Sequence, residues 1–322
     1  MSLSIVAPLD ALQACDLGQA QRAFRAIFTA DAQVKLAHPF ESLSVDAFCD
    51  GALAQLYEAF PDVERRVWIS MCAEDTNGAL WIGQGGHYAG LFAAPFLDIP
   101  PTRRWAHMRF HEFYRVEGGR IVEMQAIWDI PEVMMQAGVW PLSPSLGREM
   151  MVPGPMSCDG LQISGDGSRA IQVVSDMLEG LSHNREGEAA MRLDHYWHPR
   201  CSWYGPAGIG TARGIKGFRN HHQIPFLNAM PNRVGGKATG HLFASGDYVG
   251  FTAWPGMKMT LDGSGWLGIP PVNKDLTMRS LDFWRVDQEG MIRENWVLVD
   301  LLHVYDQLGV DVLARMREMT QT

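Results

Sequence analysis

Two acidic residues lie at equivalent points of a pattern that predicts β-strands, and both have apolar neighbours. Glu112 alternates with Phe110 and Tyr114, and Asp282 precedes Trp284 by two residues. A carboxylate buried among apolar side chains loses hydration, which raises its pKa and lets it exchange protons near neutral pH. The pattern indicates general acid/base chemistry, with an ion pair to a nearby arginine as the alternative.

The basic residues and glycines on the same segments do not predict a metal site or a cofactor site. Arg109 and Arg279 are the arginines with which the two carboxylates could pair. His107 and His111 have the spacing i, i+4 on a predicted strand, but no third ligand follows at a suitable spacing, so we expect no metal site. Gly85-Gly86 lacks the G-x-G-x-x-G spacing of a dinucleotide site, so we expect no cofactor.

The charge and hydropathy of the chain exclude some classes of partner. The net charge is −9, and no basic run is longer than the pairs Arg65-Arg66 and Arg103-Arg104, so nucleic acid is not an expected partner. The first ten residues do not resemble a signal peptide, and no apolar stretch reaches the roughly 18 residues of a membrane span. We therefore expect a cytoplasmic protein with no membrane partner.

The cysteines are odd in number, far apart and without a C-x-x-C pair, which argues against a disulfide framework. They are Cys15, Cys49, Cys72, Cys158 and Cys201.

The sequence repeats itself at an offset of 170 residues. Ile99-Pro100-Pro101-Thr102 recurs as Ile269-Pro270-Pro271-Val272, and, one insertion later, Asp129 matches Asp300 at an offset of 171. Such self-similarity predicts two copies of one structural unit. A segment rich in Pro, Gly and Ser separates the copies, so we predict a first domain over 10–142, a linker over 143–167 and a second domain over 168–319.

Each copy begins with helical periodicity and continues with strand periodicity. Helical stripes are formed by Ala20, Phe24, Ile27 and Phe28; by Phe48, Ala52, Leu56 and Phe60; and by Ala170, Val173, Val174, Met177, Leu178 and Leu181. Strands are predicted over 79–83, 105–116 and 120–130, with a hairpin turn at Glu117-Gly118-Gly119.

This order predicts an α+β fold in which a curved antiparallel sheet wraps around helices, like a cone with a pocket inside it. Successive strand residues point to opposite faces, and both faces of the predicted strands carry apolar residues. One face would line the pocket, while the other packs against another sheet. We expect the two sheets of the tandem copies to pack face to face as a pseudo-dimer, in a monomer or a homodimer.

The ordered motifs resemble the SnoaL-like polyketide cyclase family, whose fold is shared with ketosteroid isomerase and nuclear transport factor 2. In the first copy these motifs are Gly86-His87-Tyr88-Ala89-Gly90, like a turn of that family, Ile99-Pro100-Pro101-Thr102, Phe113-Tyr114-Arg115-Val116, Gly119-Arg120-Ile121-Val122-Glu123 and Asp129. In the second copy they are Trp203-Tyr204-Gly205-Pro206, Arg213-Gly214, Glu294, Trp296 and Asp300.

The resemblance implies that Asp129 and Asp300, the aspartates after the last strands, act as general acid/base in an aldol-type closure without metal or nucleotide. His87 would polarise a substrate carbonyl, and Glu112 and Asp282 would be second carboxylates of the two sites. Residues expected to bind the substrate are Trp128, Met108, Tyr204, Trp203, Trp296, Met278 and Trp254. The alternative for Asp129 and Asp300 is that they cap the helices that follow.

Three functional hypotheses follow. The first is a cofactor-independent cyclase or isomerase that acts on a small apolar carbonyl compound. The second, from another class, is a non-catalytic ligand-binding or scaffold protein whose pockets are filled by side chains. The third is water addition, as in the epoxide hydrolases of this fold, with Arg109 in the polar cluster. Neither the substrate nor the number of working pockets follows from the sequence.

Overall fold

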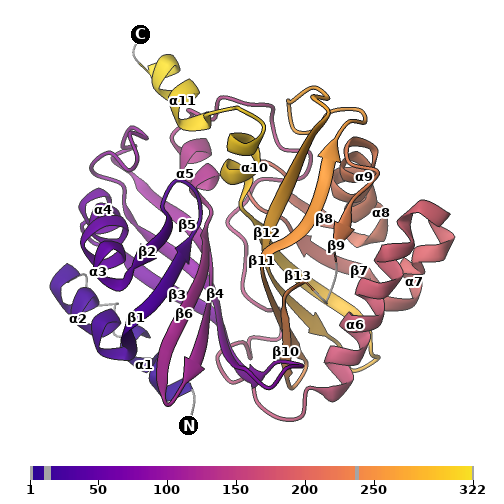
Figure 1. The fold of residues 1–322 in the computed structure, drawn as a ribbon, viewed down its shortest axis with the longest axis horizontal. Helices are drawn as coiled ribbons and strands as arrows, with labels where there is room; N and C mark the ends of the chain where they lie inside the picture. Colours follow the sequence, from indigo (N-terminus) through magenta and orange to yellow (C-terminus); the bar gives the residue numbers. More distant parts are fainter. Residues whose placement is uncertain (1–2, 11–15, 236–238, 321–322) are drawn as a thin grey trace.

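The two copies fold into two separate sheets that face each other at the centre of the molecule, with most of the helices on their outer sides (Figure 1). The computed structural model describes residues 3–10, 16–235 and 239–320. None of the helices in these ranges is long and apolar enough to cross a membrane.

The first copy carries a sheet with the order β2-β1-β6-β5-β4-β3. Its elements are η1 (Leu3–Ile5), α1 (Ala7–Asp10), α2 (Leu17–Ile27), β1 (Phe28–Leu36), β2 (Glu41–Ser44), α3 (Val45–Ala47), the π-helix η3 (Phe48–Leu53), α4 (Ala54–Ala59), β3 (Glu64–Glu74), β4 (Leu80–Leu91), β5 (Trp105–Glu117), β6 (Arg120–Trp128) and α5 (Ile130–Gln136).

The second copy carries a sheet with the order β10-β11-β12-β13-β7-β8, in which β9 also pairs with β11. Its elements are α6 (Ser168–Ser182), η4 (His183–Glu186), η5 (Ala189–Met191), α7 (Leu193–Tyr196), β7 (Trp197–Tyr204), β8 (Thr211–Arg213), α8 (Gly214–Phe218), the π-helix η6 (Arg219–Gln223), α9 (Ile224–Ala229), β9 (Val234–Gly235), β10 (His241–Ser245), β11 (Tyr248–Leu261), β12 (Lys274–Val286), β13 (Ile292–Val299), α10 (Leu301–Gln307) and α11 (Val312–Thr320).

The α+β cone and its duplication are confirmed, with two differences in detail. The strand pairs are antiparallel except that the first strand of each copy, β1 or β7, runs parallel to the last, β6 or β13. The predicted helical stripe of the N-terminal segment ends at Ile27, and Phe28 already begins β1. The predicted hairpin turn lies between β5 and β6, where Gly118 and Gly119 adopt φ of +55° and +79°.

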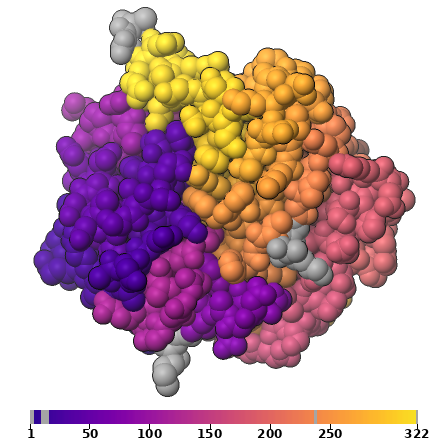
Figure 2. All heavy atoms as spheres, in the orientation of Figure 1, coloured from indigo at the N-terminus to yellow at the C-terminus, as the bar shows by residue number. Residues whose placement is uncertain are grey.

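The two sheets pack directly on each other, as expected for a pseudo-dimer. The rings of Phe113 and Phe283 stack between them with centroids 4.9 Å apart, and those of Trp68 and Trp296 lie 5.7 Å apart. On the face shown in Figure 2 the two copies meet along a continuous seam. The inner face of each sheet is therefore used for pairing, which leaves the outer face to build any pocket.

The segment over 143–167 has no helix or long strand, but it packs against both copies. The Gly160 carbonyl accepts a hydrogen bond from the Ser70 amide (2.8 Å), and the Pro153 carbonyl accepts one from Trp296 (2.9 Å). A Cβ at Gly160 would come within 2.1 Å of the Trp68 carbonyl, so the glycine permits this close approach. This segment, predicted as a linker, therefore also contacts both sheets.

Candidate functional site

A cavity of about 150 Å³, partly open to solvent, lies in the second copy between helices α6, α8 and α9 and the outer face of its sheet. We call it the Asp282 cavity. Aromatic side chains form most of its wall, among them Trp197, Trp203, Phe218, Phe226, Trp266 and Trp284. Its volume matches that of an engineered cavity that holds benzene, so it suits a compound with one or two flat rings.

Asp282 is the one acidic residue among the side chains that line this cavity. It lies on β12 with only 5% of its surface exposed, and its Oδ2 accepts a hydrogen bond from the Ser280 hydroxyl (2.8 Å). Its Oδ1 has no hydrogen-bond partner among the residues that the structure describes. Burial raises the pKa of Asp282 from 3.8 to about 7, and the bond from Ser280 opposes this only in part. At neutral pH the group can therefore both accept and donate a proton.

His222 forms another part of the wall. It lies in the π-helix η6, and its ring stacks on Trp203 at a centroid distance of 4.2 Å. Burial, with the charge of Arg233 adding to it, lowers the pKa of His222 to about 3, so the ring is neutral at physiological pH. Within the described ranges its buried Nδ1 has no partner, which leaves it available to a polar ligand.

The equivalent place in the first copy is filled. Glu112, fully buried on β5, accepts hydrogen bonds from Tyr88 (2.9 Å), Tyr114 (2.6 Å) and Trp128 (3.0 Å). Arg65 forms an ion pair with it at 2.6 Å. Glu112 does have an arginine partner, as the alternative interpretation allowed, but the partner comes from β3 and is not Arg109. A carboxylate with four partners has no free lone pair directed at a substrate.

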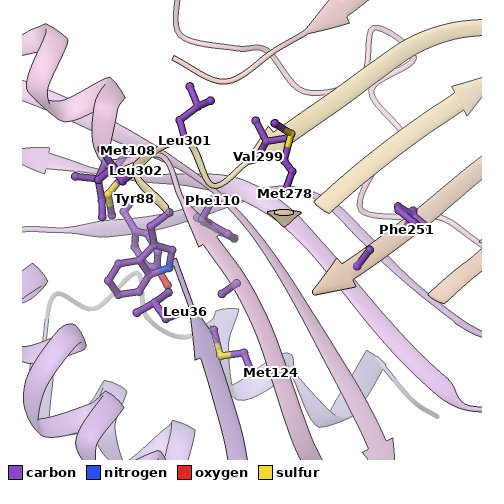
Figure 3. Close-up of a cluster of buried hydrophobic side chains, with 14 of the residues drawn as sticks. Leu36, Tyr88, Met108, Phe110, Met124, Phe251, Met278, Val299, Leu301 and Leu302 are labelled. Atoms are coloured by element: carbon purple, nitrogen blue, oxygen red, sulfur yellow. The ribbon is translucent and has the colours of Figure 1, made fainter. Parts of the chain in front are cut away.

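Figure 3 shows the packing on this side, where Tyr88, Met108 and Phe110 cluster together while Met278 and Val299 of the second copy lie on other strands. The Arg65 guanidinium lies over the Phe110 ring, 4.6 Å from its centroid. The Arg65–Glu112 ion pair and the aromatic rings around it therefore fill the interior of the first copy.

Strand register shows why the second cone stays open. Arg65 pairs with Tyr88 across β3 and β4, and Gly235 pairs with Met257 at the same place across β9 and β11. A Cβ at Gly235 would come within 2.6 Å of the Gly256 carbonyl, so this position carries no side chain where the first copy has Arg65. By the repeat offsets, Ser280 replaces Phe110, Trp284 replaces Tyr114 and Val299 replaces Trp128. Asp282 has lost the partners that neutralise Glu112.

Asp129 and Asp300 lie elsewhere, at the contact between the two copies. The Asp129 Oδ2 accepts a hydrogen bond from the Ala207 amide of the second copy (2.9 Å), and the Asp300 Oδ2 accepts one from the His38 amide of the first copy (3.0 Å). This reciprocal exchange reflects the pseudo-twofold arrangement of the copies. The carboxylates hold the loop after the first strand of the opposite copy.

Each of these aspartates also faces an arginine of its own copy. Arg109 lies 3.6 Å from Asp129, and Arg279 lies 3.0 Å from Asp300. Burial raises the pKa of both aspartates, and the arginines oppose that rise. Asp300 also caps α10 through the His303 amide (3.2 Å), whereas the side chain of Asp129 does not cap α5. The capping alternative therefore holds for one of the two residues.

Arg109 belongs to the same contact. Its guanidinium donates hydrogen bonds to the carbonyls of Tyr204 (3.2 Å), Gly205 (2.6 Å) and Val297 (3.1 Å), all in the second copy. It is fully buried and does not line the Asp282 cavity. Its donors are used to join the copies.

His87 lies within β4, not in a turn as the family motif implied. The glycines beside it allow close contact between strands, since a Cβ at Gly86 would come within 2.7 Å of the Phe110 ring. His87 pairs with Arg109 and so points to the opposite face from Glu112. The structure therefore does not bring Asp129, His87 and Glu112 together around one pocket.

His87, His107 and Glu132 form a cluster in which one ligand atom of each lies within 4.8 Å of the others. Glu132, on α5, is the third residue that sequence spacing did not find. The Trp68 indole donates to the His87 Nδ1 (3.1 Å), and because an indole nitrogen only donates, the neutral ring carries its proton on Nε2. With that proton in place, Nε2 cannot bind a metal ion.

The residues expected to bind substrate fall into three groups. Trp203 and Met278 line the Asp282 cavity. Met108 and Trp128 belong to the filled first core. Tyr204 and Trp296 stack on each other at 5.5 Å between the sheets, and Trp254 lies under the Arg279 guanidinium at 4.5 Å.

The two basic side chains of the cavity were not among the site residues predicted from the sequence. His222 and Arg233 correspond, at the offset of 170, to Ala52 and Val63 of the first copy. A polar residue in one copy at a position that is apolar and buried in the other was the available signal. It becomes visible only when the two copies are compared position by position.

Comparison with known proteins places this duplicated fold in a family. The model of the SnoaL-like polyketide cyclase family matches residues 9–137 and 175–308, well over half of the chain. The chain belongs to this family and contains two copies of its domain. No curated protein matches the chain in sequence.

Solved structures that resemble the chain each cover one copy. A protein from Jannaschia sp. CCS1, assigned as a SnoaL-like polyketide cyclase, is 18% identical, with a TM-score of 0.36, and the match covers 42% of this chain and 89% of that one. IdmH from Streptomyces antibioticus, assigned as a polyketide cyclase, is 23% identical, with a TM-score of 0.36 and coverage of 43% and 99%. AclR from Streptomyces galilaeus, assigned as a hydroxylase, is 16% identical, with a TM-score of 0.36 and coverage of 43% and 98%.

Proposed function

We propose that the second copy is a cofactor-independent acid/base enzyme, an aldol-type cyclase or isomerase, that acts on a small, largely apolar carbonyl compound in the Asp282 cavity. The observation that carries this proposal is the contrast between two equivalent carboxylates. Glu112 is neutralised by four partners, whereas Asp282 keeps an oxygen without a partner at the wall of an aromatic cavity.

The proposed reaction begins with ionised Asp282, which takes a proton from the carbon next to the substrate carbonyl. Negative charge moves to the carbonyl oxygen as the enolate forms, and neutral hydrogen-bond donors stabilise it. Trp197, Trp266 and Trp284 line the cavity, and each has an indole N–H without a partner in the described part of the chain. The apolar wall strengthens these bonds, since little water competes for them.

Two outcomes are open to the enolate. In an isomerisation, protonated Asp282 returns its proton to a different carbon of the same molecule. In an aldol closure, the enolate carbon attacks a second carbonyl of the substrate, a carbon–carbon bond forms, and Asp282 protonates the new alkoxide. Both outcomes restore the ionised carboxylate and consume no cofactor.

The first copy then serves as a built-in partner for the second. Its cone is filled by the Arg65–Glu112 pair, and its inner face supports the sheet that carries Asp282. In this proposal one fused chain replaces a homodimer and retains one working pocket.

Proton exchange from a model ketone tests the proposal. 1-Indanone is a flat bicyclic ketone, and loss of its α-proton signal in D₂O can be followed by NMR. We expect the wild-type protein to accelerate exchange and Asp282→Asn to lose at least about 100-fold, the scale of general-base catalysis. Asp129→Asn, which alters the contact between the copies, should retain the activity.

Other results would identify a different function. If Asp129→Asn abolishes exchange and Asp282→Asn does not, the proposed assignment is wrong. If the protein binds 1-indanone but does not accelerate exchange in any variant, it is a ligand-binding protein of this fold and the enzymatic proposal fails.

A further inference from the structure

Arg233 is a second charged group at the Asp282 cavity, and it lacks a counter-charge. It follows α9 and contributes to the cavity wall. One of its Nη atoms donates to the Leu181 carbonyl (3.1 Å), the other contacts the Met257 sulfur (3.9 Å), and its buried Nε has no partner. No carboxylate within the described ranges forms an ion pair with it.

The buried arginines behave differently from Arg233, which is only partly buried. Arg65, Arg109, Arg279 and Arg285 each lie within ion-pair distance of a carboxylate of their own copy, at 2.6, 3.6, 3.0 and 2.7 Å. This is the usual arrangement, because a desolvated cation costs free energy unless an anion compensates it. Arg233, partly buried in the wall of the open cavity, has no such carboxylate among the described residues.

Folding does not require an arginine at this position. The equivalent residue of the first copy is Val63, which is buried in the core of the first cone. The copy with the open cavity therefore has a cation, Arg233, where the other copy has a buried apolar side chain. Burial without a carboxylate lowers the pKa of Arg233, as expected for a cation lacking compensation.

Arg233 and Asp282 lie at different ends of the cavity. Arg233 contacts Met257, which pairs with Met278 on β12, and Asp282 lies four residues further along that strand, about 13 Å away. The charge of Arg233 also helps to lower the pKa of His222, which belongs to the Arg233 end. The rings of Trp203 and Phe226 both stack on His222, at 4.2 and 5.6 Å, so an aromatic surface adjoins the Arg233 end. A ligand that spans the cavity would meet a cation at one end and a proton-transfer group at the other.

We propose that Arg233 binds an acidic group of the substrate, which is therefore a small aromatic compound with a carboxylate at the end opposite its reactive carbonyl. This inference rests on the proposed function for the position of the carbonyl. An arginine presents a planar fork of N–H donors that fits a carboxylate, and desolvation in the cavity strengthens that contact.

The test compares two ketones of the same shape, 1-indanone-5-carboxylate and its methyl ester. Calorimetry gives Kd for each, and NMR in D₂O gives the rate of α-proton exchange. We expect the wild-type protein to prefer the acid by about 10- to 100-fold, the range for a hydrogen bond to a charged group. Arg233→Met should remove this preference, so that the acid and the ester bind with affinities within about threefold of each other.

Two controls separate binding from folding and from general surface charge. Arg233→Lys keeps the positive charge and should retain part of the preference for the acid. Arg185→Met removes an exposed positive charge near the same loop, where its Nε bonds to the Pro231 carbonyl (3.3 Å), and should change nothing. If Arg233→Met fails to fold, the acid preference of wild type and of Arg233→Lys still decides the question.

The outcomes distinguish this inference from the function on which it rests. Equal affinity for the two ketones, or an acid preference that survives in folded Arg233→Met, would overturn the role of Arg233. Exchange of the ester by wild type would then still support Asp282 as the acid/base. If neither ketone binds, both proposals fail.

Discussion

Replacing Asp282 by asparagine should stabilise the protein at neutral pH, because the ionised form of this buried carboxylate is costly in the folded state. Its pKa rises from 3.8 to about 7 on folding. A folded pKa above the unfolded value means that wild-type stability is greatest below about pH 4, declines between pH 4 and 7, and is constant above that range. Asparagine keeps the shape and does not titrate.

The expected gain from Asp282→Asn follows from the same shift. Each pH unit corresponds to about 1.4 kcal/mol, so the variant should be more stable than wild type by about 2 kcal/mol at pH 5 and by about 4 kcal/mol at pH 8. Urea unfolding at the two pH values, followed by tryptophan fluorescence, gives both differences. Activity should be lost in the same variant, since stability and function conflict at this residue.

The matched variant in the first copy should have the opposite sign. Glu112→Gln leaves the Arg65 guanidinium buried without its anion, which should destabilise the protein by about 3–5 kcal/mol at pH 8. If Asp282→Asn destabilises the protein, or if its effect does not grow between pH 5 and pH 8, then Asp282 is ionised and compensated like Glu112, and our account of the cavity is wrong.

Three further predictions concern the cavity and the contact between the copies. Ser280→Phe introduces the residue that fills the first copy, so it should abolish binding of 1-indanone in calorimetry while circular dichroism remains unchanged; retained binding would place the ligand elsewhere. The rate of α-proton exchange should rise tenfold per pH unit below about pH 7 and level off above it, as Asp282 ionises; a flat pH profile would exclude this base. Arg109→Met should lower the free energy of unfolding by about 3–5 kcal/mol, because Asp129 and three carbonyls each lose their contact with the guanidinium. A loss below about 1 kcal/mol in urea unfolding would show that this arginine does not hold the two copies together.

The fold could be predicted because it depends on patterns that lie within the sequence itself. The offset of 170 residues gives the duplication, and the change from helical to alternating periodicity gives the α+β unit. Apolar residues on both faces of the strands indicated that the sheets pair. Phe113 and Phe283 stack between the sheets, on the strand face opposite Glu112 and Asp282, whereas the alternation alone did not say which face makes this contact.

The arrangement of the site could be predicted only in part, since it depends on partners far away in the sequence. Glu112 and Asp282 look equivalent in sequence, yet Arg65 reaches only the first of them. The packing of the two copies sets the environment of Asp129 and Asp300, and no local pattern shows that each carboxylate bonds to a loop of the other copy.

The most direct test of the central claim is a crystal structure of the protein soaked with 1-indanone. Our account predicts that the ketone lies in the Asp282 cavity, with its α-carbon within reach of the Asp282 carboxyl, and that the Arg65–Glu112 pair of the first copy is undisturbed. A ketone bound beside Glu112, or beside Asp129 at the contact between the copies, would contradict the claim that the second copy holds the working site.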